Sequence, residues 1–174
     1  MKRTALVLVV LAAASVTASA ASRAPEEVIA NLVTGYCLSE KTGAPLPAGS
    51  IDPRAVGTRL TSRDRFARLS PTALRIPTGS GNVYHDATAD YCDVHASNVD
   101  PARTIARLES ELKQRGLRFD RAPVRSSGKS KDGNRRPDLV LIIAVPVSNP
   151  KVPLITITYD DDPSVVSIGV AVGR

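Results

Sequence analysis

The sequence predicts an α+β fold in which an antiparallel β-sheet of four to six strands carries two main helices packed on one face. Three observations support this class. Two segments have apolar residues at helical spacing, residues 91–97 alternate in polarity, and the last third of the chain is rich in β-branched residues. Short turns separate the C-terminal runs, so we expect them to form an antiparallel meander.

The first helix is expected from Pro25 to Ser39. Proline suits the first helical position, and two glutamates in the first turn suit the positive end of the helix dipole. Gly35 interrupts the pattern at a cost of about 1 kcal/mol relative to alanine, which predicts close packing or local fraying. The apolar face consists of two rows, Val28, Leu32, Tyr36 and Ile29, Val33, Cys37.

The segment from Tyr91 to Gly116 contains a strand followed by a capped helix. Asp100 is a suitable N-cap and Pro101 a suitable first residue for a helix that ends at Arg115, because glycine is the usual residue after a helix end. The residues expected to be buried are Cys92, Val94 and Ala96 in the strand and Ile105, Leu108 and Leu112 in the helix.

The remaining segments differ in how clearly they predict structure. Prolines break up residues 50–90, where we expect only a short helix at Ser62–Leu69 and a turn at Gly79–Asn82 between two extended pieces. A further strand could open at Leu117–Phe119. The three C-terminal strands, of which the first should be central, are expected at Asp138–Val145, Val152–Tyr159 and Ser164–Val172.

Residues 1–20 have the three parts of a cleaved signal peptide. Lys2 and Arg3 form its positive end, an apolar run follows, and Ala18-Ser19-Ala20 supplies the small residues before the cut. The apolar run is shorter than the roughly 20 residues of a membrane span, so we favour cleavage over an uncleaved anchor. Residues 21–174 should then form a single domain, periplasmic or secreted, without a transmembrane segment.

Cys37 and Cys92 are the only cysteines of the chain. An even number in an exported protein favours a disulfide, and both residues lie on apolar faces that point to the same core. The bond would close a loop of 55 residues and stabilise the fold by about 4 kcal/mol. Two buried free thiols are the alternative, and redox catalysis is disfavoured because the sequence has no C-x-x-C motif.

The stretch from Arg103 to Arg136 is basic, with eleven basic and four acidic residues. Its composition predicts a mobile basic loop near residues 125–137, which either binds a polyanion or only keeps the surface soluble. Phe119 is its only aromatic residue, which disfavours nucleic acid and favours anionic lipid head groups or glycans. The candidate anion-binding residues are Arg118, Arg121, Arg125, Lys129, Lys131, Arg135 and Arg136.

His85, Asp93 and His95 are the residues around which a hydrolase site could be assembled. Asp93 should share a strand face with His95 and could raise its pKa. The sequence has no recognisable nucleophile motif and no closely spaced metal ligands, so we expect neither a metal nor a cofactor. A surface histidine is the simpler interpretation of His95.

Several short motifs occur in a characteristic order. A signal peptide precedes Cys37 in the first helix, the Cys92-Asp93-Val94 strand and the Asp100-Pro101-Ala102 helix start. This order resembles a loose group of small exported bacterial proteins without an assigned activity, which implies an α+β fold and no functional residue. We predict a non-enzymatic module that binds an anionic envelope component or another envelope protein. The alternatives are the hydrolase and a secreted enzyme inhibitor.

Overall fold

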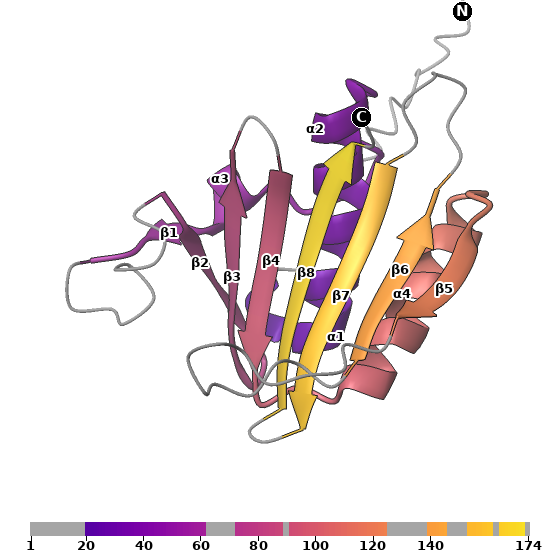
Figure 1. Cartoon of the computed structure of the whole chain (residues 1–174). Coiled ribbons are helices and arrows are strands. Elements are labelled where there is room, and N and C mark those ends of the chain that lie inside the picture. The colour runs from indigo at the N-terminus through magenta and orange to yellow at the C-terminus, as the bar shows by residue number, and fades with distance from the viewer. Residues whose placement is uncertain are drawn as a thin grey trace, which may run out of the picture.

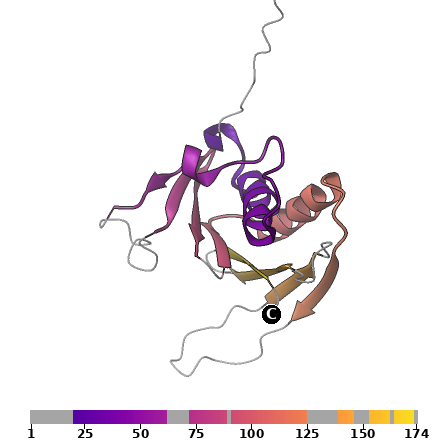
Figure 2. The same ribbon diagram turned by 90° about the horizontal axis from the view of Figure 1, so that it is seen from above.

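The computed structural model describes residues 20–61, 72–88, 91–124, 139–145, 153–161 and 164–172 of the chain. The eight strands of these segments form one antiparallel sheet in the order β1-β2-β3-β4-β8-β7-β6-β5 (Figure 1). The long helices lie together on one face, and the sheet curves around them (Figure 2). The α+β class with an antiparallel sheet is therefore confirmed, whereas the predicted four to six strands were too few.

The strands are short at one edge of the sheet and long in its C-terminal half. The edge strand β1 has only two residues, and the opposite edge strand β5 contains Pro123 and exposed charges at Asp120 and Arg121. Neither has the alternation that marks a strand, which explains the low predicted number. The strands are β1 Thr58–Arg59, β2 Leu74–Thr78, β3 Gly81–Ala87, β4 Tyr91–Ser97, β5 Asp120–Val124, β6 Leu139–Ala144, β7 Pro153–Asp161 and β8 Ser164–Val172.

The predicted strands are found close to their expected positions. The turn at residues 79–80 joins β2 to β3, and β6, β7 and β8 form the expected antiparallel meander. Leu117–Phe119 precedes β5 and is not part of it, and β6 is second from the edge rather than central. The predicted helix at Ser62–Leu69 lies outside the described residues.

The first helix runs from Pro25 to Thr42, three residues beyond its predicted end. It consists of α1 Pro25–Asn31, a π-helical segment η2 Leu32–Cys37 and α2 Leu38–Thr42, and Gly43 ends it with a φ of +70°. Gly35 is closely packed rather than frayed, because a Cβ there would lie 2.8 Å from Ser50 Cβ and 3.3 Å from Arg115 Nη2. The shorter helices are η1 Ala20–Ser22 and α3 Pro53–Val56.

The second long helix, α4, spans Pro101–Gln114 as the capping signals predict. The Asp100 carboxylate accepts hydrogen bonds from the backbone N–H groups of Ala102 and Arg103, at 2.8 and 3.1 Å. Gly116 follows with a φ of +68°. Local interactions, the Asp100 cap and the left-handed glycine, therefore define both ends of α4.

The chain contains two successive units, each consisting of a long helix followed by four strands. A long helix precedes the four strands β1–β4, and α4 precedes the four strands β5–β8. The last strand of each half, β4 and β8, pair antiparallel in the middle of the sheet, with Val94 opposite Ile168. The centre of the sheet therefore joins residues that are 68 to 80 positions apart in sequence, from the Ser97–Val165 pair to the Tyr91–Ala171 pair.

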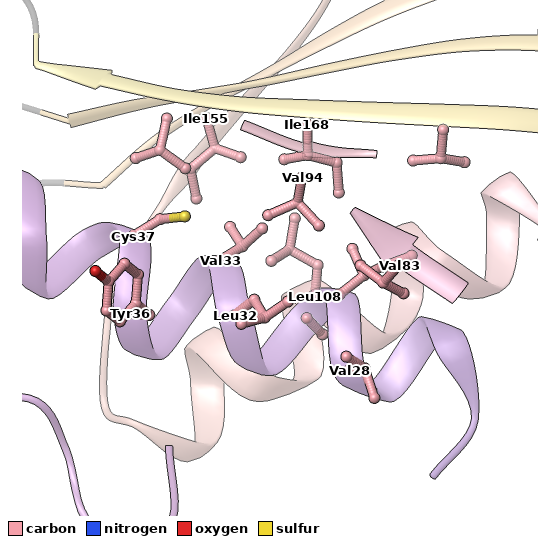
Figure 3. Close-up of a cluster of buried hydrophobic side chains, with 14 of the residues drawn as sticks. Val28, Leu32, Val33, Tyr36, Cys37, Val83, Val94, Leu108, Ile155 and Ile168 are labelled. Atoms are coloured by element: carbon pink, nitrogen blue, oxygen red, sulfur yellow. The ribbon is translucent and has the colours of Figure 1, made fainter. Parts of the chain in front are cut away.

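The hydrophobic core fills the space between the sheet and the two long helices (Figure 3). Leu32 and Leu108, one from each helix, are fully buried, as are Ile155 and Ile168 of the sheet. Burial of each such side chain stabilises the fold by about 1.5–3 kcal/mol. All six residues that the strand and helix patterns predicted to be buried are buried, namely Cys92, Val94, Ala96, Ile105, Leu108 and Leu112.

Candidate functional site

The β3–β4 hairpin carries the three residues of the predicted hydrolase site, but on opposite faces. His85 of β3 lies opposite Val94 of β4 and points into the core. Asp93 and His95, which alternate with Val94, lie on the face of the sheet away from the helices. The sheet therefore separates His85 from the other two residues, and the predicted three-residue site is not formed.

His85 forms a buried cluster with the Cys37–Cys92 disulfide, which confirms the predicted bond. The bond joins the last residue of η2 to β4 with a Cα–Cα distance of 5.6 Å. His85 Nε2 lies 3.2 Å from Cys92 Sγ, and the Tyr36 ring contacts the imidazole at nearly a right angle, with ring centroids 5.1 Å apart. Figure 3 shows Tyr36 and Cys37 side by side on the helix. We call Cys37, His85 and Cys92 the inner cluster.

Burial determines the charge of the inner cluster. It lowers the pKa of His85 from 6.5 to about 4, against a smaller opposite effect of Asp86. The imidazole is therefore neutral at pH 7. The ligand atoms of Cys37, His85 and Cys92 lie within 4.8 Å of one another. Among the described residues, these three form the group of side chains that could together hold a metal ion. In the disulfide state neither sulfur is a thiolate, which is the form of cysteine that binds metals. The absence of a metal stays a prediction.

His95 belongs to a second, outer group of polar residues. Its Nδ1 lies 2.8 Å from the hydroxyl oxygen of Ser167, the residue opposite it on β8. Its Nε2 lies 4.0 Å from an oxygen of Asp93. Gly169 lies opposite Asp93, and a Cβ there would come within 3.0 Å of the Asp93 carboxylate. Cross-strand register therefore assembles this outer group, which the sequence alone did not reveal because Ser167 belongs to a distant strand.

The prediction that Asp93 raises the pKa of His95 was wrong. Burial lowers the pKa of His95, and the opposing effect of Asp86 is smaller. Burial, and then the Asp86 carboxylate, raises the pKa of Asp93 itself. The His95 side chain is only 26% exposed, so it is half-buried rather than a free surface histidine.

The outer group has the composition of a catalytic triad but not its geometry. At 4.0 Å the Asp93 carboxylate is too far from the imidazole for a hydrogen bond. Both β4 and β8 are paired on both sides, so their backbone N–H groups belong to the sheet ladder and cannot form an oxyanion hole. This arrangement positions the imidazole rather than activating a nucleophile.

A cavity of about 170 Å³ lies where the C-terminal ends of both long helices meet the end of β6. Hydrogen bonds hold the loop over it in place. Ile51 N–H donates to Asn31 Oδ1 at 2.7 Å, and Ser39 Oγ donates to the Pro45 carbonyl at 3.3 Å. We call it the Arg115 cavity. Its described lining residues are Thr34, Leu38, Ser39, Thr42, Ala44, Pro45, Pro47, Arg115, Leu117 and Val145.

Arg115 is the only charged residue among the described residues of this wall. Its side chain is 14% exposed, and its Nη1 donates to Ser50 Oγ at 3.2 Å. Its Nε lies 3.8 Å from Glu111 Oε2 and is buried without a hydrogen-bond acceptor in the described part of the chain. Glu111 is bonded more closely to Arg107, at 2.9 Å. A buried donor without an acceptor costs about 1–3 kcal/mol.

Two of the predicted anion-binding residues are described, and they differ from Arg115. Arg118 is exposed, and the exposed Arg121 donates to Glu109 at 3.1 Å beside an open groove of about 410 Å³. Neither is desolvated, so each interacts weakly with an anion. The other residues, Arg125, Lys129, Lys131, Arg135 and Arg136, and the predicted basic loop at 125–137 lie outside the described residues. Arg115 lies in the basic stretch Arg103–Arg136, but no feature of the sequence distinguished it from its neighbours as an anion-binding residue.

Comparisons of the chain with protein-family models, curated proteins and solved structures find no match. Among the helices that the structure describes, none has both the length and the apolar character needed to cross a membrane.

Proposed function

We propose that this protein is an exported, non-enzymatic binding module of the cell envelope that takes a small anionic ligand with an apolar part in the Arg115 cavity. The observation that carries the proposal is the Arg115 guanidinium, which lies largely buried in an otherwise uncharged wall. Binding sites typically combine an apolar lining with a few polar groups that fix the orientation of the ligand.

The disulfide supports the exported location. Disulfides persist in oxidising compartments and are rare in the cytosol. The Cys37–Cys92 bond is fully buried and joins the first helix to the middle of the sheet. This agrees with the signal peptide predicted at residues 1–20, of which residues 1–19 lie outside the described residues.

Size and charge define the ligand class. An apolar cavity of about 150 Å³ holds one benzene molecule, and the Arg115 cavity is of similar size at about 170 Å³. A guanidinium binds a carboxylate through paired hydrogen bonds, and this interaction is stronger where water is excluded. Small aromatic or short-chain aliphatic carboxylates therefore fit the cavity best.

Titration with benzoate, followed by amide NMR shifts of the isotopically labelled protein, tests the proposal. We expect saturable shifts at Thr34, Leu38 and Leu117. Binding should weaken by about tenfold or more in Arg115→Gln, since a charge-assisted hydrogen bond contributes about 1.5–3 kcal/mol.

Arg118→Gln is the matched control, because it removes the same charge from an exposed position three residues away. It should bind benzoate like the wild type. Benzamide, which has the same ring without the charge, should bind more weakly than benzoate. Equal binding of both compounds, or an unchanged affinity in Arg115→Gln, would contradict the proposal.

A hydrolase is the second candidate function, and one contact favours it. Ser167 Oγ lies 2.8 Å from His95 Nδ1, so a serine and a base are in hydrogen-bond contact. A fluorophosphonate probe should label Ser167 covalently if this serine is activated. We expect no labelling above that of Ser167→Ala, and stoichiometric labelling that Ser167→Ala abolishes would establish the hydrolase instead.

A further inference from the structure

We propose that the inner cluster becomes a copper-binding site when its disulfide is reduced. Once the disulfide is reduced, Cys37, Cys92 and His85 bind one Cu(I) ion through two thiolates and one imidazole. The Arg115 cavity plays no part in this inference, and neither does the proposed function.

The spacing of the ligand atoms is the first argument. The two sulfurs and a ring nitrogen of His85 lie within 4.8 Å of one another, and His85 Nε2 is already 3.2 Å from Cys92 Sγ. Metal–sulfur bonds are about 2.3 Å and metal–nitrogen bonds about 2.0 Å long, so the ligands of a three-coordinate ion lie roughly 4 Å apart. Separation of the two sulfurs after reduction is therefore the main movement that the site requires.

The elements that carry the ligands already hold them around one point. Cys37 comes from the end of η2, while His85 and Cys92 come from neighbouring strands on the same face of the sheet. The Tyr36 ring packs against the imidazole of His85 and restricts its orientation. A site supported in this way needs little reorganisation when the ion binds.

The ligand set favours a soft ion that accepts few ligands. Thiolates select Cu(I) and Zn²⁺ over hard cations, and imidazole suits both. Structural Zn²⁺ is almost always four-coordinate, whereas the described residues offer three ligands within this group. All three residues are buried, which leaves no exposed side for a water ligand. Cu(I) is therefore the better match.

The chemistry balances with one external reductant. A dithiol protein of the thiol–disulfide oxidoreductase class transfers two electrons and two protons to the Cys37–Cys92 bond, and its own thiols become a disulfide. The sulfur–sulfur bond breaks and two thiols form. Cu(I) then replaces both thiol protons, which pass to solvent, and no electron moves in this second step.

Reduction also provides a path for the ion. The disulfide is the covalent link between the first helix and β4, and the terminal segment α2 has only five residues. Without this link, α2 is held by the Lys41 ammonium, which donates to the Thr88 carbonyl of the β3–β4 turn at 2.6 Å, and by the packing of Leu38 in the core. Local opening at the helix end would then expose the cluster without global unfolding.

Anaerobic competition for Cu(I) tests the proposal. The protein is reduced with a phosphine, freed of reductant and mixed with the Cu(I)–bicinchoninate complex, whose loss of colour reports transfer. We expect the reduced wild type to take one Cu(I) per chain with ultraviolet thiolate-to-copper absorption. The oxidised protein and Cys37→Ser/Cys92→Ser should take none. His85→Gln should bind about tenfold more weakly or worse, while the matched His95→Gln should bind like the wild type.

Folding is monitored in the same samples, because reduction removes a cross-link. Cu(I) should raise the thermal midpoint of the reduced wild type and leave that of the double serine variant unchanged. Competition no better than that of the double serine variant would overturn the proposal. Equal affinity in wild type and His85→Gln would overturn the three-ligand site, and so would a reduced chain that binds Cu(I) equally well in urea. Tighter binding of Zn²⁺ in a parallel competition would overturn the choice of Cu(I).

Discussion

The two faces of the β3–β4 hairpin place the two histidines of the chain in contrasting surroundings. His85 lies on the helix-covered face beside the disulfide, and burial takes its pKa to about 4. His95 lies on the other face, half-buried and hydrogen-bonded to Ser167. The contrast teaches that alternation along a strand, rather than sequence distance, decides the surroundings of a residue. The inner face should therefore control stability, while the outer face should tolerate change.

The largest expected difference between the faces is in packing, and two adjacent residues of β7 measure it. Ile155 is fully buried on the inner face, and Thr156 is half-buried on the outer face. Ile155→Ala should lower the free energy of unfolding by about 2–5 kcal/mol, and Thr156→Ala should change it by less than about 0.5 kcal/mol. Urea unfolding followed by circular dichroism measures both. Similar losses in the two variants would show that the outer face is packed as tightly as the inner face.

The second difference is in pH dependence, measured on the oxidised protein. Because the folded pKa of His85 is about 4 rather than 6.5, the unfolded chain binds a proton in this range that the folded chain does not. Stability should therefore fall as pH falls from 6.5 to 4, by up to about 1.4 kcal/mol per pH unit from this group. His85→Gln should flatten this part of the profile.

His95→Gln should flatten the same profile less, and so serves as the control. The pKa of His95 is also lowered by burial, so its contribution has the same sign. The raised pKa of Asp93 acts in the opposite direction, because the folded chain then binds the additional proton. Equal flattening in the two histidine variants would remove the proposed difference between the faces.

The smallest expected effect concerns the contact between Ser167 and His95. Ser167→Ala removes one partly exposed hydrogen bond and should lower the free energy of unfolding by about 1 kcal/mol or less. The His95 imidazole should also titrate differently in histidine NMR spectra, because it loses its Nδ1 partner. A loss of several kcal/mol would mean that the outer group is a structural centre comparable to the inner face.

Local chemistry made much of the fold predictable. The Asp100 cap and Gly116 defined α4, and the alternation from Cys92 to Ala96 identified the buried face of β4. The disulfide followed from the cysteine count and from two apolar faces. The edge strands β1 and β5 were not predicted as such, since a two-residue strand and a proline-containing strand have no periodicity to detect.

The candidate sites were less predictable, because they depend on contacts between distant segments. His85 and Cys37 are 48 residues apart, and His95 and Ser167 are 72 residues apart. Metal-ligand motifs and nucleophile motifs are recognised by short spacing, which neither pair has. The Arg115 cavity likewise requires both long helices and the end of β6 to meet.

The sequence by itself determined where the two long helices begin, where α4 ends, which strand residues are buried, and which cysteines pair. These properties depend on interactions between neighbours along the chain or on the simple division between apolar and polar residues. The tertiary structure alone decided that β4 pairs with β8, and with this pairing the opposite surroundings of the two histidines. The physical reason is that no short turn joins β4 to β8, so nothing local fixes their pairing, which depends on how the buried faces of distant strands pack against the helices.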